Sequence, residues 1–277
     1  MGNIKIYLKK LFKIINKTEM KILPGQVAFF LLISLIPSIT LFGVICSIFS
    51  ISTTDIFNMF ANVLPKSTFE MLEPFINQTL SGHSILIYFF IGFVLASNGP
   101  HSMVLTSNIL YGIEQKSYLE HRIKAFLLTI ILMFIFAFTL VVLAFGNIIV
   151  KMIFELEILN NVSDIFYHLF VYLKWPVAFL LLFIGLKLIY TMTPDKKILS
   201  KTTTKGSLFT TIGWLFVTAI YSYYANNIAH YDLFYGSLSN VAILMMWIYI
   251  LSYIFVIGII INANSYKFME ENTSNKN

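Results

Sequence analysis

The sequence predicts an all-α membrane protein, a polytopic bundle of six transmembrane helices, and three observations carry this prediction. Of its 277 residues, 58% are hydrophobic and 12% are charged, whereas soluble domains carry about 25% charged residues. No charged residue lies between Asp232 and Lys267, and a helix of about 20 apolar residues is long enough to cross the hydrocarbon core of a bilayer. Lysines and arginines lie mainly on one predicted side of the membrane, the side that faces the cytoplasm by the positive-inside rule.

The basic net charge of +6 follows from this topology. On the predicted external side the basic residues are Lys66, Lys151 and Lys174, while the acidic residues divide almost evenly between the two sides. The charge therefore does not indicate a nucleic-acid partner, and both termini are expected in the cytoplasm. The single cysteine, Cys46, excludes an internal disulfide.

The first predicted segment, residues 1–26, is a basic cytoplasmic stretch with two faces. Its apolar residues recur at helical spacing on one face and its lysines on the other. This pattern predicts a helix lying on the membrane surface with its lysines near anionic lipid headgroups. An unstructured basic leader is the alternative. Because the following apolar run is too long and lacks a small-residue cleavage site, we do not expect a cleavable signal peptide.

The membrane domain is predicted over residues 27–266, and a disordered cytoplasmic tail over residues 267–277. Leu23-Pro24-Gly25 is expected to break the chain before the first span. Between the first two spans, two amphipathic stripes predict short external helices that cannot cross the bilayer. The six spans are expected at about 27–50, 85–111, 125–150, 175–193, 207–228 and 239–262.

The second span is unusual because its apolar run, Ile85–Ala96, is too short to cross the bilayer alone. The span must continue through Ser97-Asn98-Gly99-Pro100 toward Tyr111, so a broken helix is predicted at membrane depth. Many transporters build a substrate site from such a helix. A kink whose free backbone groups are satisfied by neighbouring helices explains the same pattern.

The sequence offers little for catalysis. Of the five histidines, His101 is expected at membrane depth, and His121 and the others are expected in loops or at interfaces; no carboxylate falls inside a predicted span. Metal-dependent hydrolysis needs several ligands that converge on one site, and neither a phosphate-binding glycine loop nor a Gly-x-Ser-x-Gly elbow occurs. We therefore predict no enzyme, no metal and no cofactor. With no buried charge expected, no ion-coupling residue is predicted either.

A set of uncharged polar residues, prolines and one tryptophan remains at predicted membrane depth. These residues either line a substrate path through the bundle or hold the helices together by interhelical hydrogen bonds, each contributing about 0.6–2 kcal/mol. Asn240, Trp247 and Asn262 share one face of the last span with Gly258. The candidate site residues are Gln26, Ser34, Pro37, Asn98, Pro100, Asn108, Thr218, Asn240, Trp247 and Asn262.

Three stretches resemble the YihY/virulence factor BrkB family. They are the run Gln26–Pro37, the motif Ala96–Pro100 followed by Asn108, Tyr111 and Gly112, and Tyr235-Gly236-Ser237-Leu238 followed by Trp247-Ile248-Tyr249 and Gly258 to Asn262-Ala263. The resemblance covers about Lys21 to Lys267 and departs at Ile260-Ile261, where the family often has an acid before the asparagine. It implies a six-span protein of the bacterial cytoplasmic membrane with a suspected transport role. An earlier ribonuclease BN label of the family is regarded as an error.

The leading functional hypothesis is a transporter or exporter of an amphipathic or lipid-like substrate. The broken second span and the uncharged polar faces favour it. The alternative is a non-catalytic envelope scaffold, which predicts that substitutions in the surface helices matter and that substitutions of Asn98 or Asn240 do not. A ribonuclease is the third, disfavoured hypothesis, because no acidic metal cluster is visible in the sequence. The expected partners are the lipid bilayer and, at the N-terminal lysines, anionic lipids.

Overall fold

The computed structural model describes residues 18–48, 84–114, 117–135, 163–227 and 238–274. Within these ranges every regular element is a helix, which confirms the all-α prediction. The predicted surface helix at the N-terminus and the external helices between the first two spans lie largely outside the described residues. The helices are α2 (Thr18–Ile48), α5 (Ser84–Ala96), α6 (Asn98–Tyr111), a helix covering residues 118–135, α8 (Ser163–Met192), α9 (Ser200–Asn227) and α11 (Ser239–Ser274).

Two of the described helices are long and apolar enough to cross a membrane. They are Glu19–Leu41 within α2 and Ser239–Glu270 within α11, which correspond to the first and last predicted spans. Pro176–Met192, in the fourth predicted span, is apolar but shorter. The full set of six crossings stays a prediction.

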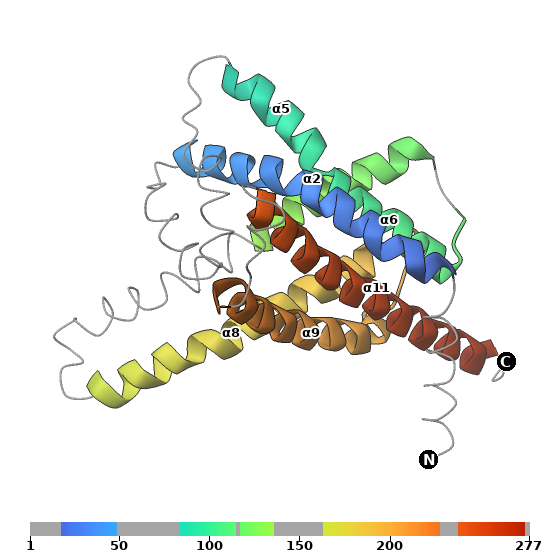
Figure 1. The fold of residues 1–277 in the computed structure, drawn as a ribbon. Helices are drawn as coiled ribbons and strands as arrows, with labels where there is room; N and C mark the ends of the chain where they lie inside the picture. Colours follow the sequence, from blue (N-terminus) through green and yellow to red (C-terminus); the bar gives the residue numbers. More distant parts are fainter. Residues whose placement is uncertain (1–17, 49–83, 115–116, 136–162, 228–237, 275–277) are drawn as a thin grey trace.

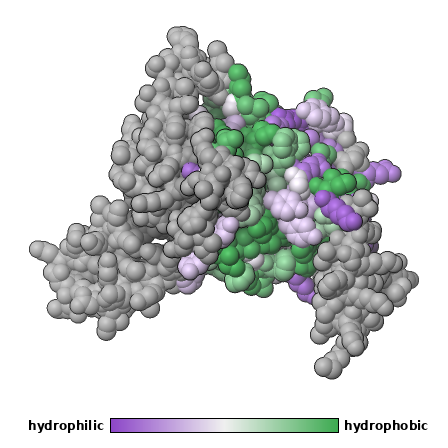
Figure 2. All heavy atoms as spheres, viewed as in Figure 1, coloured by the Kyte–Doolittle hydropathy of each residue, from purple (hydrophilic) through white to green (hydrophobic). Residues whose placement is uncertain are grey.

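The outer surface of the described helices is rich in large hydrophobic side chains. Phe90, Phe134 and Phe216, from three different helices, are 66%, 72% and 65% exposed. In Figure 2 the middle of the coloured surface is mainly hydrophobic, and hydrophilic residues gather toward the right-hand side. Such a surface is costly in water and favourable against lipid tails, as expected of a protein in a membrane.

Several helices run past the bounds expected for them: α8 begins at Ser163 and α9 at Ser200, ahead of the spans predicted from 175 and 207. α2 continues through Pro24 and Gly25, so the predicted break before the first span is wrong. A membrane helix tolerates proline because neighbouring helices satisfy the freed backbone groups, and Pro24 is buried here. α11 extends through most of the tail predicted to be disordered. Lys196 contacts the exposed side of α11 here, where it forms an ion pair with Glu270 at 2.9 Å and lies over the Tyr266 ring.

α11 is the centre of the arrangement (Figure 1). It packs against α9 and against α2, α8 packs on α9, and α5 and α6 pack on α2. The start of α2, the end of α6, the α8–α9 turn and the end of α11 meet at one end of the molecule, which we call the α8–α9 end. The main hydrophobic core lies there and includes Met20, Tyr111, Ile198 and Ala263. The sequence predicts this end to be cytoplasmic.

The second predicted span is broken as expected, at Ser97 between α5 and α6. Pro100 lies in the first turn of α6, where a backbone N–H has no intrahelical partner in any case. Arg122, from the helix 118–135, binds polar groups on both sides of the break. Its guanidinium donates to the Val94 carbonyl at 2.8 Å and to Asn98 Oδ1 at 2.9 Å. Groups at the break are therefore satisfied by a neighbouring helix.

α9 and α11 approach each other closely at two glycines. A Cβ atom at Gly206 would collide with the Gly258 carbonyl oxygen, and a Cβ atom at Gly258 with the hydroxyls of Tyr190 and Thr210. The Gly206 N–H donates to Asn262 Oδ1 at 2.8 Å. Small residues allow helix backbones to meet inside a membrane, so this crossing fixes α11 against α9.

Candidate functional site

A buried polar network lies at the α8–α9 end, with Asp195 at its centre. The Asp195 side chain is 4% exposed, and its two oxygens have different partners. His121 Nε2 lies 2.7 Å from Oδ2, and Lys124 Nζ lies 2.8 Å from Oδ1. Lys124 also donates to the Pro194 carbonyl at 2.7 Å and keeps 23% of its side chain exposed. The network therefore holds an ion pair that is largely removed from water.

Asn108 clamps the same aspartate from α6. Its Oδ1 accepts a hydrogen bond from the Asp195 backbone N–H at 2.9 Å, and its Nδ2 donates to Asp195 Oδ2 at 2.5 Å. The neighbouring Ser107 donates to the Thr193 hydroxyl at 2.9 Å. These bonds join α6 to the α8–α9 turn. We call the group Asn108, His121, Lys124 and Asp195 the Asp195 network.

The local sequence explains how the Asp195 network is positioned. The helix that carries His121 and Lys124 begins with a serine N-cap. In it Ser117 Oγ accepts a hydrogen bond from the Glu120 N–H at 3.4 Å and donates to Glu120 Oε1 at 3.1 Å. His121 and Lys124 are three residues apart and therefore share a face of this helix. Pro194, two residues after the end of α8, prevents that helix from continuing and leaves Asp195 in the turn.

The Asp195 carboxyl is held in its ionised form. Burial acts to raise its pKa, but the hydrogen bonds from Lys124 and Asn108, the positive charge of Lys124 and the hydrogen bond from His121 together hold the pKa below its ordinary value. The network is thus a carboxylate that is stabilised by three donors from two helices.

This pKa direction predicts how stability depends on pH. A carboxyl whose pKa is lower in the folded state contributes stability that is fully present above the unfolded pKa, about 3.9 for aspartate, and is lost as the pH falls through the folded pKa. We expect the melting temperature of the purified protein, followed by circular dichroism, to fall as the pH drops below about 4. In Asp195→Asn the melting temperature is expected to fall less at acidic pH than in the wild type. If the melting temperatures of D195N and the wild type fell in parallel below about pH 4, ionised Asp195 would not be the source of this stability.

The sequence did not predict the burial of Asp195 and His121. Both lie outside the predicted spans, and on that ground the sequence placed His121 in a loop or at an interface. His121 is 3% exposed. Its burial and that of Asp195 result from contacts between residues 74 and 87 positions apart. The available signal was an aspartate directly after an apolar span, together with a histidine and a lysine three residues apart.

The structure distributes the predicted site residues over separate helix contacts. Asn108 belongs to the Asp195 network, Asn98 accepts a hydrogen bond from Arg122, and Asn262 accepts one from Gly206. Each of these contacts joins two different helices or segments. The three asparagines therefore lie at three distinct interhelical junctions.

Of the other predicted site residues, Trp247 and Thr218 also join two helices. Trp247 Nε1 donates to Thr218 Oγ1 at 3.3 Å between α11 and α9. The Ser34 hydroxyl donates to a carbonyl of its own helix at 2.9 Å. The remaining four have partly or fully buried side chains: Gln26, Pro37, Pro100 and Asn240. A shared role of these residues in a substrate path stays a prediction.

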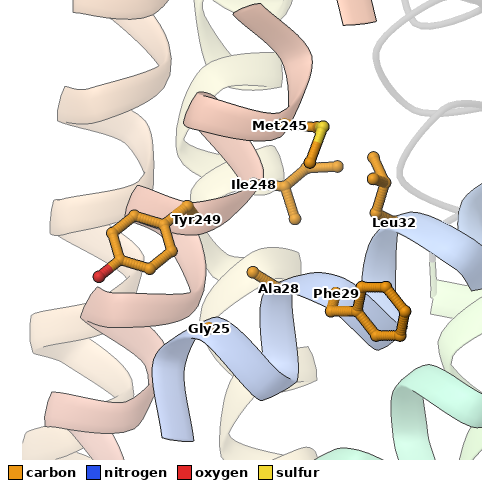
Figure 3. A pocket seen from close by; sticks show the side chains of 7 residues that line it. All are labelled: Gly25, Ala28, Phe29, Leu32, Met245, Ile248 and Tyr249. Carbon is orange, nitrogen blue, oxygen red and sulfur yellow. The ribbon is translucent and has the colours of Figure 1, made fainter. Parts of the chain in front are cut away.

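An apolar groove lies between α2 and α11 (Figure 3). Phe29, Met245 and Tyr249 are 56%, 49% and 44% exposed, so the groove is open to the outer surface. Ala28 and Ile248 are buried and pack together in the same contact. Both helices are long and apolar enough to cross a membrane. It has a volume of about 260 Å³ and is lined by Gly25, Ala28, Phe29, Leu32, Met245, Ile248 and Tyr249.

A metal centre finds no support in the described part of the chain. No three His, Cys, Asp or Glu side chains in these ranges are grouped so that they could hold a metal ion. The Asp195 network contributes one carboxylate, and Lys124 already occupies one of its oxygens. Two-metal hydrolysis of a phosphodiester requires several converging acids.

The chain is similar to known proteins along almost its whole length. It is 28% identical over 265 residues to YfkH of Bacillus subtilis, a protein named as ribonuclease-like, and the match covers 94% of this chain and 95% of that one. It is 25% identical over 276 residues to a UPF0761 membrane protein of Prosthecochloris aestuarii, covering 91% of this chain and 58% of that protein, less than two thirds of its length. No solved structure matches. The family model described as virulence factor BrkB matches residues 11–277. This match confirms the resemblance seen in the sequence, and this membrane protein belongs to the virulence factor BrkB family.

Proposed function

We propose that this protein crosses the bacterial cytoplasmic membrane six times, with both termini in the cytoplasm, and transports or exports an amphipathic or lipid-like substrate. The groove between α2 and α11 carries the proposal. It lies between the two helices of the described chain that are long enough to span a membrane. A substrate would enter it sideways from the bilayer.

The lining of the groove favours an acyl chain. Its side chains are apolar except for the phenol of Tyr249. Inside a membrane, apolar groups gain little from leaving lipid, so selection of a tail depends on shape and packing. Gly25 and Ala28 have small side chains and leave space on the α2 side of the groove. Tyr249 adds one hydroxyl that can bind a polar group of an amphipathic molecule.

The broken second span also favours the transport proposal. α5 and α6 are separate helices joined at Ser97, and both pack on α2. Discontinuous helices of this kind form substrate sites and moving parts in many transporters. α2 therefore both lines the groove and contacts the two helices of the broken span.

The proposal is tested by filling the groove. In Gly25→Leu the new side chain points into open space, since a Cβ atom there would lie 4.0 Å from its nearest neighbour, the Tyr249 ring. Wild-type protein in proteoliposomes is expected to move a fluorescent short-chain phospholipid between leaflets. G25L is expected to slow this movement, because the added side chain would occupy the space that an acyl chain needs in the groove. The measurement is the rate of dithionite quenching.

Ile33→Phe is the matched control. Ile33 lies on the same helix, is 40% exposed and does not line the groove, so I33F should transport at the wild-type rate. The proposal fails if wild-type protein moves no lipid, or if G25L and I33F are equally active.

The scaffold alternative is favoured by a different observation. Asn98, Asn262 and Trp247 each bind a neighbouring helix rather than one shared cavity, as expected if polar residues serve helix association. As a scaffold, the protein would support an envelope assembly through its surface helices without moving any lipid. Three results together would favour this alternative. Substitutions in the surface helices would cause envelope defects in cells, Asn240→Leu would keep full function, and the protein would move no lipid in vesicles.

A further inference from the structure

The face of α2 that lines the apolar groove continues toward the α8–α9 end and carries a lysine there. The α2 residues of the lining recur at spacings of three and four positions and so share a face: Gly25, Ala28, Phe29 and Leu32. Lys21 lies four residues before Gly25 on the same unbroken helix and therefore on the same face. At 1.5 Å per residue it is displaced by about 6 Å along the helix axis. Lys21 thus lies at the α8–α9 end of the groove.

The ammonium group of Lys21 is available to an anion. Its side chain is exposed, and it makes no hydrogen bond or ion pair within the described part of the chain. Glu19, the acidic residue in the first turn of α2, is two positions away and therefore points to the opposite side of the helix. The carboxylates of Asp195 and Glu270, at the same end of the molecule, are already paired with other lysines.

The positions of Lys21 and the groove match the two parts of a lipid molecule. The stretch of α2 that is long and apolar enough to cross a membrane is Glu19–Leu41, and Lys21 lies in its first turn. A lysine near the end of a membrane helix extends its ammonium group into the headgroup layer. The phosphates of phospholipids lie in that layer and their acyl chains lie deeper, at the depth of the apolar lining that follows Gly25.

Tyr249 supplies a polar group at the Gly25 end of the lining. Its ring would lie 4.0 Å from a Cβ atom at Gly25, and its hydroxyl points away from Leu32 and Met245 in Figure 3. The side chain is 44% exposed, and its hydroxyl has no hydrogen-bond partner in the described ranges. The Tyr253 ring follows one turn further toward the α8–α9 end, with the two ring centroids 6.3 Å apart. A phenol at the boundary between acyl chains and headgroups can donate to an ester or phosphate oxygen.

We propose that Lys21 binds the phosphate of an anionic phospholipid whose acyl chain lies in the groove between α2 and α11. This inference rests on the proposed function and names the class of its substrate. A phosphate without a compensating cation in its headgroup is the better partner for a single ammonium group, so phosphatidylglycerol is favoured over phosphatidylcholine. The sequence predicts anionic lipids at the N-terminal lysines, and Lys21 is the lysine of residues 1–26 that lies in the described part of the chain.

The test measures lipid binding to the full chain in detergent by native mass spectrometry. Phosphatidylglycerol and phosphatidylcholine with the same acyl chains are added in turn, and the wild type is expected to bind phosphatidylglycerol more tightly. Lys21→Gln should weaken phosphatidylglycerol binding about fivefold, the contribution of one basic residue near a membrane surface, and leave phosphatidylcholine binding unchanged. Lys21→Arg keeps the positive charge and should bind both lipids as the wild type does.

Two further variants locate the lipid. Lys201→Gln is the matched control, because Lys201 is an exposed lysine at the start of α9 that does not line the groove; K201Q should keep the preference for phosphatidylglycerol. Gly25→Leu fills the groove and should weaken the binding of both lipids. If the groove and Lys21 hold one molecule, adding K21Q to G25L should have little further effect, because the two substitutions act on the same bound lipid.

Two results would overturn the inference: phosphatidylglycerol binding in K21Q equal to that of the wild type, or equal losses in K21Q and K201Q, which would indicate attraction to the whole basic surface. If G25L does not fold, K21Q and K201Q decide alone. Movement of both lipids in proteoliposomes at the same rate in K21Q and wild type would keep the proposed function and remove the role of Lys21. Binding that depends on Lys21 without movement of any lipid would keep the lipid site and remove the proposed function.

Discussion

Asp195→Asn is expected to lower the free energy of unfolding by about 3 kcal/mol, the low end of the range for breaking a buried ion pair by removing one partner. The low end applies because Lys124 keeps 23% of its side chain exposed and can recover some hydration. His121, by contrast, is buried and loses its acceptor. Detergent-solubilised protein, unfolded by denaturant and followed by circular dichroism, gives this value.

A double-mutant cycle separates the ion pair from the rest of the Asp195 network. Lys124→Gln removes the positive charge that faces Asp195. In the K124Q protein, D195N should therefore lower the free energy of unfolding by less than it does in the wild type. The difference between the two values is the coupling energy of Asp195 and Lys124. Glu270→Gln breaks an exposed ion pair at the same turn, and no measurable change is expected. If D195N were as stable as E270Q, the network would contribute nothing to the fold.

Features that depend on local pattern were predictable from the sequence. The all-helical class, the last span and the break at Ser97 follow from apolar run length and from a glycine–proline pair, and the structure contains them. The helix ends were less predictable. Pro24 lies inside α2, where neighbouring helices bury it, and α11 continues through most of the predicted tail.

The candidate site was the least predictable part, for a physical reason. Uncharged polar residues in apolar runs stand out in a sequence, whereas an aspartate in a turn looks solvated. Asp195 is buried because Asn108 and Lys124, distant in sequence, fold around it. Likewise the close approach of Gly206 and Gly258 depends on the way α9 crosses α11. A sequence pattern does not encode such contacts between distant residues directly.

Gly206→Ala is expected to destabilise the protein by about 3 kcal/mol, the upper part of the range for overpacking. The added methyl would meet the carbonyl oxygen of Gly258 and the side chain of Asn262. A backbone oxygen cannot rotate away, so α9 and α11 must separate and the hydrogen bond from the Gly206 N–H to Asn262 is strained or lost. The same substitution in an open helix would stabilise it by up to about 1 kcal/mol, because alanine is the better helix former.

Gly25→Ala supplies that comparison within the same chain. A Cβ atom at Gly25 would lie 4.0 Å from the Tyr249 ring, an ordinary contact distance, so G25A should be as stable as the wild type or slightly more stable. The two glycine substitutions are thus expected to change stability in opposite directions. Thermal unfolding of both variants in detergent measures this. If G206A melted no lower than G25A, the α9–α11 crossing would have room to shift, and the contact between the two glycines would not hold these helices together.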